Sequence, residues 1–322
     1  MKRILVTGGA GFIGSNLTDA LLKAGYSVTV LDNFSTGKRE NLAHLSGNPD
    51  FTLIEGDIRN MDDCRKAVTG VEAVFHEAAL GSVPRSIKTP DLTTAVNIGG
   101  FVNMLTAAKD ARIKRFIYAS SSSVYGDCQD SPKVEERTGT PLSPYALTKS
   151  VNEQFAGNFA KIYGIECIGL RYFNVFGRRQ DPGGAYAAVI PKFSAALIKH
   201  TAPVINGDGS YSRDFTYIDD VIQANFLALT VENHEALNKV YNVACGSETT
   251  LNELFAYLKE ELGKYDPEIS AIEAVHGAVR AGDIPHSKAD ISRAAALLGY
   301  QPRHNVKTGL QETAQWYFES LS

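Results

Sequence analysis

The stretch "VTGGAGFIGSNL", residues 6–17, decides the fold, because it joins a short apolar run to a segment with helical spacing. Gly9, Gly11 and Gly14 match the pattern G-x-G-x-x-G. Gly8, Gly11 and Gly14 match a second pattern with three-residue spacing. In either pattern the glycines let the backbone turn tightly and approach a pyrophosphate at the positive end of a helix. The stretch therefore predicts a phosphate-binding loop between a first strand and a first helix.

Short apolar runs alternate with helical patterns through the first half of the chain. Strands that are apolar along nearly their whole length, separated by helices, are typical of a parallel sheet covered on both faces. We therefore predict an α/β fold with a doubly wound parallel Rossmann sheet. The expected strands are "RILVTG" (3–8), "SVTVLD" (27–32), "FTLIEGD" (51–57), "EAVFHEAA" (72–79), "RFIYASS" (115–121) and "ECIGLRYF" (166–173), with helices over 16–25 and 101–111 between them.

The pattern loosens after about residue 171, where "NVFGRRQDPGGAY" resembles a loop. We expect a nucleotide-binding domain over residues 1–174 and a smaller C-terminal α/β substrate domain over residues 175–322. Near residues 215–243, "FTYIDDVIQANFLAL" and "VYNVA" predict a helix and a strand that return to the first sheet.

Composition excludes several classes of function. With 322 residues, 44% hydrophobic residues, 21% charged residues and a net charge of −4, the chain has no broad basic surface for nucleic acid or an anionic membrane. No apolar run has membrane length, and glycines interrupt the opening "MKRILVTGG" too early for a signal peptide. Four scattered cysteines suit free thiols in a reducing cytoplasm, and the histidines form no ligand pair that predicts a metal site.

Asp32 ends the second expected strand, 18 residues after Gly14. A carboxylate at this place can bind both ribose hydroxyls of NAD, and it would repel the 2′-phosphate of NADP. The alternative is a merely structural aspartate, and the nearby Lys38 and Arg39 would weaken the repulsion. The position favours NAD.

In "SPYALTKS", residues 143–150, Tyr145 and Lys149 stand four residues apart and share one helix face. Lowering a tyrosine pKa from near 10 by about three units takes roughly 4 kcal/mol. A lysine ~4–6 Å away contributes about 3–4 kcal/mol at an effective dielectric near 20, and NAD⁺ adds positive charge. The pair can therefore form a tyrosinate base, unless it is only two ordinary residues of a helix.

The serine run in "YASSSSVYG", residues 118–126, follows an expected strand directly. A flexible loop is the usual interpretation of such a run. Ligands of open α/β sheets, however, bind beyond the carboxyl ends of the strands. These hydroxyls are therefore expected to face the same crevice as Tyr145.

Taken in this order, the glycine loop, Asp32, the serine run, Tyr-x-x-x-Lys and "RYFNVFG" resemble the extended short-chain dehydrogenase/reductases over nearly the whole chain. Within them the chain is most similar to UDP-sugar 4-epimerases, and among these to the bacterial UDP-N-acetylglucosamine 4-epimerases. The similar strings are "ALGSVPRS" (79–86), "LSPYA" (142–146), "FNVFGRRQDP" (173–182), "GAYAAVIPK" (184–192) and "INGDGSYSRDF" (205–215).

The resemblance implies a mechanism of transient oxidation. Tyr145 would remove the proton of the sugar 4-hydroxyl while hydride passes from C4 to NAD⁺, and the 4-keto sugar would rotate and be reduced on its other face. Lys149 would be the charge partner of Tyr145 and a ligand of the nicotinamide ribose, and Ser121 would bind the reacting oxygen. The implied NAD contacts are Gly8, Gly11, Phe12, Ile13, Gly14, Asp32, Asn33, Gly37, Asp57, Ile58, Tyr145, Lys149 and Tyr172.

The substrate side is also implied by resemblance. Arg213 and Arg280 would clamp the UDP pyrophosphate, Asp283 would bind the uridine ribose, and Ser287 would stand at the gate that admits an N-acetyl group. Ser287 could instead be a helix N-cap or a loop serine. The remaining implied contacts are Ser82, Ser121, Ser122, Tyr145, Asn174, Ala188, Val189, Lys192 and Ile205.

Several alternatives stay open at this level. Related 4,6-dehydratases carry Asp-Glu directly after the catalytic hydroxyl residue, and decarboxylases commonly carry a Glu, whereas this chain has Ser122 and Ser123. Many UDP-galactose epimerases have a lysine where this chain has Gly81. A UDP-glucose 4-epimerase and a non-catalytic NAD-binding protein are further candidates. The resemblance also implies a homodimer through helices near residues 92–111 and 145–163.

Overall fold

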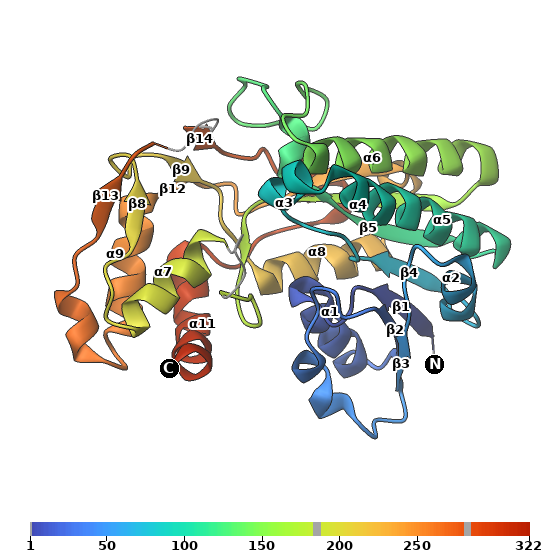
Figure 1. Cartoon of the computed structure of the whole chain (residues 1–322). Coiled ribbons are helices and arrows are strands. Elements are labelled where there is room, and N and C mark those ends of the chain that lie inside the picture. Colours follow the sequence, from blue (N-terminus) through green and yellow to red (C-terminus); the bar gives the residue numbers. More distant parts are fainter. Residues whose placement is uncertain (1, 183–187, 280–284) are drawn as a thin grey trace.

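The computed structural model describes residues 2–182, 188–279 and 285–322, which form two lobes (Figure 1). Within the described residues, the larger lobe contains a seven-stranded parallel sheet in the order β11-β6-β5-β4-β1-β2-β3. The Rossmann-type α/β fold predicted from the strand pattern is confirmed. The strands are β1 Arg3–Thr7, β2 Ser27–Asp32, β3 Phe51–Glu55, β4 Ala73–His76, β5 Arg115–Ser121, β6 Glu166–Tyr172 and β11 Lys239–Val243.

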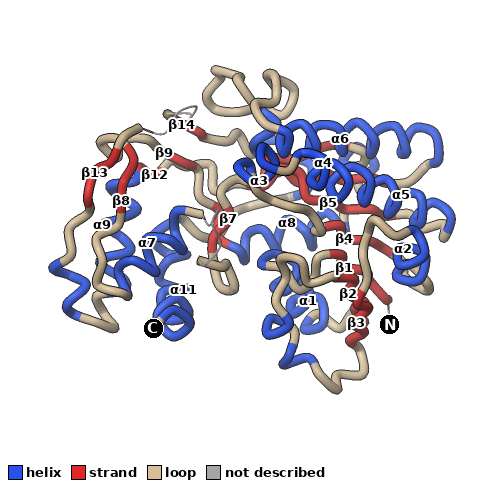
Figure 2. Tube along the Cα trace, in the orientation of Figure 1, coloured by secondary structure: helices blue, strands red, loops and turns tan. Residues whose placement is uncertain are grey.

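Successive side chains of the buried strands point to opposite faces of the sheet, so the apolar core is divided between the two faces. Leu5 and Phe116 belong to one cluster of buried side chains, while their neighbours Val6 and Ile117 belong to another. Helices α2, α5 and α6 pack together on the first face, and α1 and α8 on the second (Figures 1 and 2). These helices are α1 Phe12–Lys23, α2 Met61–Ala67, α5 Phe101–Asp110, α6 Pro144–Tyr163 and α8 Ile218–Thr230.

Helix α6 has well-defined ends. Its N-cap Ser143 accepts a hydrogen bond from the backbone N–H of Ala146 at 3.1 Å, and Pro144 occupies the first turn. Gly164 closes the helix in the left-handed conformation, with φ 73°. Because the helix begins near the carboxyl edge of the sheet, its first two turns bring Tyr145 and Lys149 to that edge.

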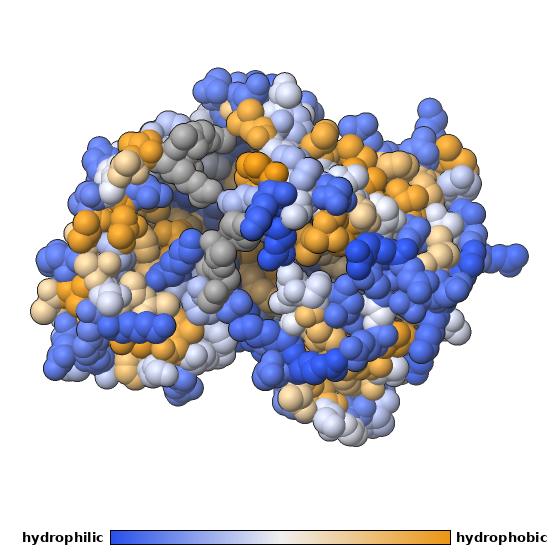
Figure 3. Space-filling model, in the orientation of Figure 1, coloured by the Kyte–Doolittle hydropathy of each residue, from blue (hydrophilic) through white to orange (hydrophobic). Residues whose placement is uncertain are grey.

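The smaller lobe is built from helices and from short sheets of two or three strands (Figure 2). The chain returns to the large sheet when β11 pairs with β6. In the space-filling view the outline of the molecule is indented between the two lobes (Figure 3). The elements of this lobe and the junction are α7 Val189–Ile198, α9 Leu251–Leu262, α10 Ser292–Leu298, α11 Val306–Leu321, β7 Val175–Phe176, β8 Val204–Asn206, β9 Ser212–Arg213, β10 Thr216–Tyr217, β12 Thr249–Thr250, β13 Val275–Gly277 and β14 His286–Ser287.

Shorter elements complete the description. Helices α3 Val83–Lys88 and α4 Pro90–Thr94 lead through a π-helical segment, Ala95–Gly100, into α5. Single 3₁₀ turns cover Arg39–Asn41, Ala43–Leu45, Ser122–Tyr125, His234–Ala236 and Pro267–Ala271. Over the described ranges, no helix combines the length and the apolar character that a membrane span requires.

Candidate active site

A cavity of about 390 Å³ lies at the carboxyl edge of the large sheet. It brings together nearly all the residues implied as NAD contacts, and the candidate catalytic groups lie in the same wall. Gly37 is outside this lining and packs against Ala10. The predicted residues that line the cavity are Gly8, Gly11, Phe12, Ile13, Gly14, Asp32, Asn33, Asp57, Ile58, Ser121, Tyr145, Lys149 and Tyr172.

The glycine loop follows the three-residue spacing, since Gly8, Gly11 and Gly14 line the cavity and Gly9 does not. Gly8 has a φ of 69°, and a Cβ there would lie 2.8 Å from the backbone of Ala78, so only glycine fits. Gly11 is the N-cap residue of helix α1 and provides no side-chain cap, and the first turn of the helix has no acidic residue. Its N-terminus therefore presents a positive dipole end that suits a pyrophosphate.

Asp32 is buried at the end of β2, where both carboxylate oxygens are held by backbone groups. Oδ2 accepts a hydrogen bond from the N–H of Ala10 at 2.9 Å, and Oδ1 accepts one from the N–H of Phe34 at 2.8 Å. Burial raises the pKa of Asp32, and these two hydrogen bonds oppose that shift. Each oxygen keeps a second lone pair, so the carboxylate can shape the loop and still bind a ribose hydroxyl.

Lys38 and Arg39, the cations that could attract a 2′-phosphate, have acidic partners. Lys38 Nζ lies 3.0 Å from Asp181 Oδ1, and Arg39 Nη2 lies 2.7 Å from Glu55 Oε2. Pairing with these carboxylates reduces the positive charge that the two side chains offer to a third group. The site's residues fit NAD as the cofactor.

The candidate catalytic residues come from two elements: Ser121 ends β5, and Tyr145 and Lys149 lie in the first two turns of α6. Ser121 and Tyr145 both line the cavity. Burial raises the pKa of Tyr145, and the Ser121 hydroxyl only partly offsets the effect. Lys149 Nζ donates to the carbonyl oxygen of Ala119 at 2.7 Å, which directs the ammonium toward the end of β5.

Glu77 is a residue of this cavity that the sequence analysis missed. It follows β4, and its Oε1 accepts a hydrogen bond from the Tyr172 hydroxyl at 3.0 Å. Burial raises the pKa of Glu77 to about 7, while the Tyr172 hydrogen bond and the charge of Lys149 oppose the rise. The signal was available, because an acid at the carboxyl end of an apolar strand is the same feature that identified Asp32.

Glu77 in turn influences Lys149. Burial lowers the pKa of Lys149 to about 8, and the negative charges of Glu77 and Glu153 oppose that decrease. The two carboxylates therefore help to keep the ammonium protonated near neutral pH. A protonated Lys149 is the state that would stabilise a negative charge on Tyr145.

We predict that Glu77→Gln shifts the basic limb of the pH profile of kcat to lower pH. Glu77 raises the pKa of Lys149, so its neutral replacement lets the ammonium lose its proton earlier as the pH rises. The measurement is kcat between pH 6 and pH 9 for the parental protein and for the variant. Glu72→Gln, at an exposed position before β4, is the control and should leave the profile unchanged. Superimposable profiles for Glu77→Gln and the parental protein would contradict the coupling.

A buried ion pair fixes the elements that carry these groups. Glu153 lies one turn after Lys149 on α6, and its carboxylate accepts hydrogen bonds from Arg171 Nε at 2.9 Å and Nη2 at 2.8 Å. The same carboxylate accepts a hydrogen bond from the Ser120 hydroxyl at 2.5 Å. The guanidinium also lies over the ring of Tyr125, 4.9 Å from its centroid. This network ties α6 to β5 and β6. It thus holds the position of Lys149 on α6 and that of Ser121, the residue after Ser120 on β5.

Ser121 and Tyr145 line this cavity, and the other described residues implied for the substrate lie outside its lining. Arg213 and Ser287 are register partners on β9 and β14, so Ser287 is a strand residue and the alternative of a helix N-cap is wrong. Arg280 and Asp283 lie outside the described residues. The others are Ser82 at the N-cap of α3, Ser122 after β5, Asn174 before β7, Ala188, Val189 and Lys192 at the start of α7, and the buried Ile205 on β8.

Comparison with known proteins agrees with this geometry. A putative UDP-glucose 4-epimerase from Methanocaldococcus jannaschii is 38% identical over 315 residues, which cover 97% of each chain. The structure of a UDP-N-acetylglucosamine 4-epimerase from Methanobrevibacter ruminantium, in complex with UDP-N-acetylmuramic acid, is similar with a TM-score of 0.91, 39% identity and 99% coverage of both chains. The UDP-glucose 4-epimerase of Thermotoga maritima, solved with UDP-glucose, matches with a TM-score of 0.90 and 37% identity, over 99% of this chain and 100% of the other.

The family model described as "NAD dependent epimerase/dehydratase family" matches residues 4–244. That range contains the glycine loop, Asp32 and the Ser121, Tyr145 and Lys149 group. The match covers more than half of the chain, and the relatives align over 97–99% of it. The protein belongs to the NAD-dependent epimerase/dehydratase family.

Proposed function

We propose that this protein epimerises a UDP-hexose at C4, and that its main substrate pair is UDP-N-acetylglucosamine and UDP-N-acetylgalactosamine. The observation that carries the proposal is the cavity in which Ser121, Tyr145 and Lys149 share a wall with Asp32 and the glycine loop. A protein that only binds NAD has no need of a base and its charge partner. The UDP-sugar relatives supply the substrate class.

In the proposed mechanism each residue of the group has a separate task. The Tyr145 phenolate accepts the proton of the sugar 4-hydroxyl, while the Ser121 hydroxyl donates a hydrogen bond to the reacting oxygen. The Lys149 ammonium stabilises the phenolate by charge. NAD⁺ held by the glycine loop and Asp32 would supply the hydride acceptor, and then the hydride donor, for C4 of the sugar. Tyr145 then returns its proton to the new alkoxide, so nothing is oxidised overall.

Dehydration and decarboxylation are less well supported than epimerisation. Removal of water across C5 and C6 needs a further acid and base beside the tyrosine. The residues directly after Ser121 are Ser122 and Ser123, whose hydroxyls are poor acids and bases near neutral pH. The nearby carboxylates of Glu77 and Glu153 are hydrogen-bonded to Tyr172 and Arg171.

UDP-glucose is the second candidate substrate, favoured by the names of two of the relatives. We place the acetylated sugar first because Ser287 occupies the position that resembles the gate. A serine leaves space for a 2-acetamido group and can bind its amide. The same open pocket would also admit the smaller UDP-glucose.

The experiment that tests the proposal is incubation of the purified protein with UDP-N-acetylglucosamine, with UDP-glucose in parallel. Separation of the products should show the galacto epimer, with the larger kcat/KM for the acetylated sugar. Epimerisation of UDP-glucose alone would replace the first substrate by the second. A 4-keto-6-deoxy product would identify a dehydratase. Unchanged UDP-sugars of every kind would favour a non-catalytic NAD-binding protein.

We also propose that the protein forms a homodimer through residues 92–111, which include the end of α4 and all of α5, and through α6. Leu92 on α4 is 40% exposed and Leu147 on α6 is 52% exposed, and α4 and α5 both pack against α6, so apolar side chains of neighbouring helices remain accessible. Light scattering should give twice the mass of one chain. Leu147→Glu should give one chain mass, whereas Val204→Glu, at a similarly exposed valine of the smaller lobe, should not. A parental monomer would contradict the proposal.

We place the protein in the cytoplasm. Cys64, Cys128, Cys167 and Cys245 are all free thiols, as expected in a reducing compartment. Fractionation of source cells would test the assignment, and recovery outside the cytoplasmic fraction would contradict it.

A further inference from the structure

Asp214, which follows β9, is a buried carboxylate that the proposed mechanism does not use. Its side chain is fully buried. Oδ1 accepts a hydrogen bond from the N–H of Cys245 at 2.9 Å, and Oδ2 accepts hydrogen bonds from the N–H groups of Gly246 at 3.1 Å and Ala289 at 3.2 Å. Burial of a carboxylate is unfavourable unless its lone pairs are satisfied, and here backbone donors from two distant segments satisfy them.

The backbone of Asp214 extends the same set of contacts. Its N–H donates to the carbonyl oxygen of Ser287 at 2.9 Å, and its own carbonyl oxygen accepts a hydrogen bond from Asn174 Nδ2 at 3.0 Å. Arg213 is the preceding residue. Asp214 therefore bonds to, or directly adjoins, three residues implied as substrate contacts: Asn174, Arg213 and Ser287.

These contacts add to the backbone hydrogen bonds by which Lys288 and Asp290 pair with Lys133. Over the described residues, strand β14 pairs with β9 at two positions, His286 with Ser212 and Ser287 with Arg213. Asn174 has a φ of 32°, which is a strained conformation for a residue other than glycine. The carboxylate bond to Ala289 prolongs the short pairing, and the Asn174 side-chain bond holds the strained residue against the same backbone.

We propose that Asp214 is the positioning residue of the nucleotide-sugar site, where it locks β14 and the turn at residues 245–246 onto β9 so that Arg213 and Ser287 keep a fixed spacing. It acts through these neighbours and does not touch the substrate. The inference rests on the proposed function only in taking Arg213, Asn174 and Ser287 as substrate contacts. Burial raises the pKa of Asp214 to about 7, and the hydrogen bonds from the three backbone N–H groups oppose that shift.

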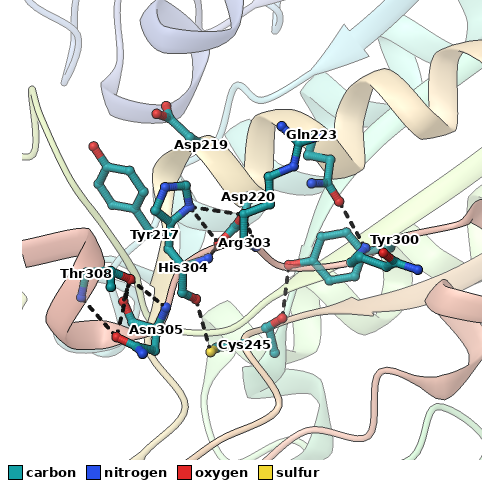
Figure 4. A network of polar contacts seen from close by, with 12 residues as sticks. Tyr217, Asp219, Asp220, Gln223, Cys245, Tyr300, Arg303, His304, Asn305 and Thr308 are labelled. Carbon is teal, nitrogen blue, oxygen red and sulfur yellow. Dashed lines mark hydrogen bonds and ion pairs between the residues drawn. The ribbon is translucent and has the colours of Figure 1, made fainter. Parts of the chain in front are cut away.

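Asp220 on α8 provides a matched control. It is 1% exposed, and its carboxylate accepts hydrogen bonds from the N–H groups of Arg303 at 2.8 Å and His304 at 3.1 Å (Figure 4). It joins α8 to the segment before α11, which contains none of the implied substrate contacts. The two networks meet at Cys245, whose thiol donates to the carbonyl oxygen of His304 at 3.2 Å. The Asp220 variant therefore also tests whether disturbance of the neighbouring network is enough to weaken UDP binding.

The test compares Asp214→Asn and Asp220→Asn as NAD-loaded proteins, using calorimetric titration with UDP and the KM and kcat for the UDP-hexose. In Asp214→Asn the amide can still accept from Cys245, but its NH₂ group then faces the N–H groups of Gly246 and Ala289, so those bonds are lost. We expect at least a tenfold increase in the Kd for UDP and in KM, with kcat changed less than about threefold and NAD content unchanged. Asp220→Asn should keep the parental Kd.

The inference would be overturned if Asp214→Asn and the parental protein had equal Kd values for UDP. It would also be overturned if Asp214→Asn and Asp220→Asn raised this Kd by the same factor. If Asp214→Asn does not fold, amide hydrogen exchange of the parental protein, measured with and without UDP, tests the inference instead. UDP should slow the exchange of the Gly246 and Ala289 amides together, and no change would count against Asp214. Failure of the parental protein to bind UDP would instead contradict the proposed substrate class, so the two failures are distinguishable.

Discussion

Tyr145→Phe should lower kcat at least ~10²-fold for the UDP-hexose, which is a typical contribution of general acid–base catalysis. The variant keeps the aromatic ring but loses the hydroxyl proposed as the base. Burial raises the pKa of Tyr145, so in the proposed mechanism its ionisation depends on positive charge from Lys149 and the cofactor. Without this hydroxyl, none of Ser121, residue 145 and Lys149 can accept the substrate proton at this position.

Steady-state kinetics checks this result, and extraction of the cofactor checks that NAD remains bound. Tyr163→Phe, at the last residue of α6, is the matched control. Tyr163 is 51% exposed and lies outside the cavity lining, so its variant should retain parental kcat. Near-parental turnover in Tyr145→Phe would refute the assignment of the base.

Ser287→Tyr should abolish activity on UDP-N-acetylglucosamine while activity on UDP-glucose is retained or improved. Ser287 lies on β14 opposite Arg213, and its backbone carbonyl is fixed by the N–H of Asp214. A tyrosine at this fixed position would occupy the volume that a 2-acetamido group needs as the sugar turns. Exclusion by overlap discriminates more strongly than the loss of one contact, because the pocket cannot relax around the surplus group.

The measurement is kcat/KM for both sugars with the parental protein, Ser287→Tyr and Ser292→Tyr. Ser292 is exposed at the start of α10, so its variant introduces the same side chain away from β14 and should keep the parental ratio. If Ser287→Tyr still epimerises the acetylated sugar at near-parental kcat/KM, Ser287 is not the gate. A loss of activity on both sugars would also contradict the selective role.

The amino-acid sequence by itself was enough to predict the large sheet and the cofactor loop. Each of the predicted strands, including the returning segment at residues 240–244, corresponds to a strand of the sheet. The glycine loop, Asp32 and the Tyr145–Lys149 pair lie in one cavity, as expected. These features were predictable because each depends on residues that are close together in the sequence. The patterns are an apolar run, a turn that needs glycine, and a spacing of one helical turn.

Only the tertiary structure revealed which polar groups support the site. Tyr172 meets Glu77 across 95 residues of chain, Arg171 meets Glu153 across 18, and Ala289 meets Asp214 across 75. A buried carboxylate is stable only beside donors that satisfy it, and those donors come from whichever strand or turn the packed fold places next to it. Such pairs follow no sequence period. The sequence thus determined the framework and the candidate reacting residues, while the packing of distant segments decided what holds them in place.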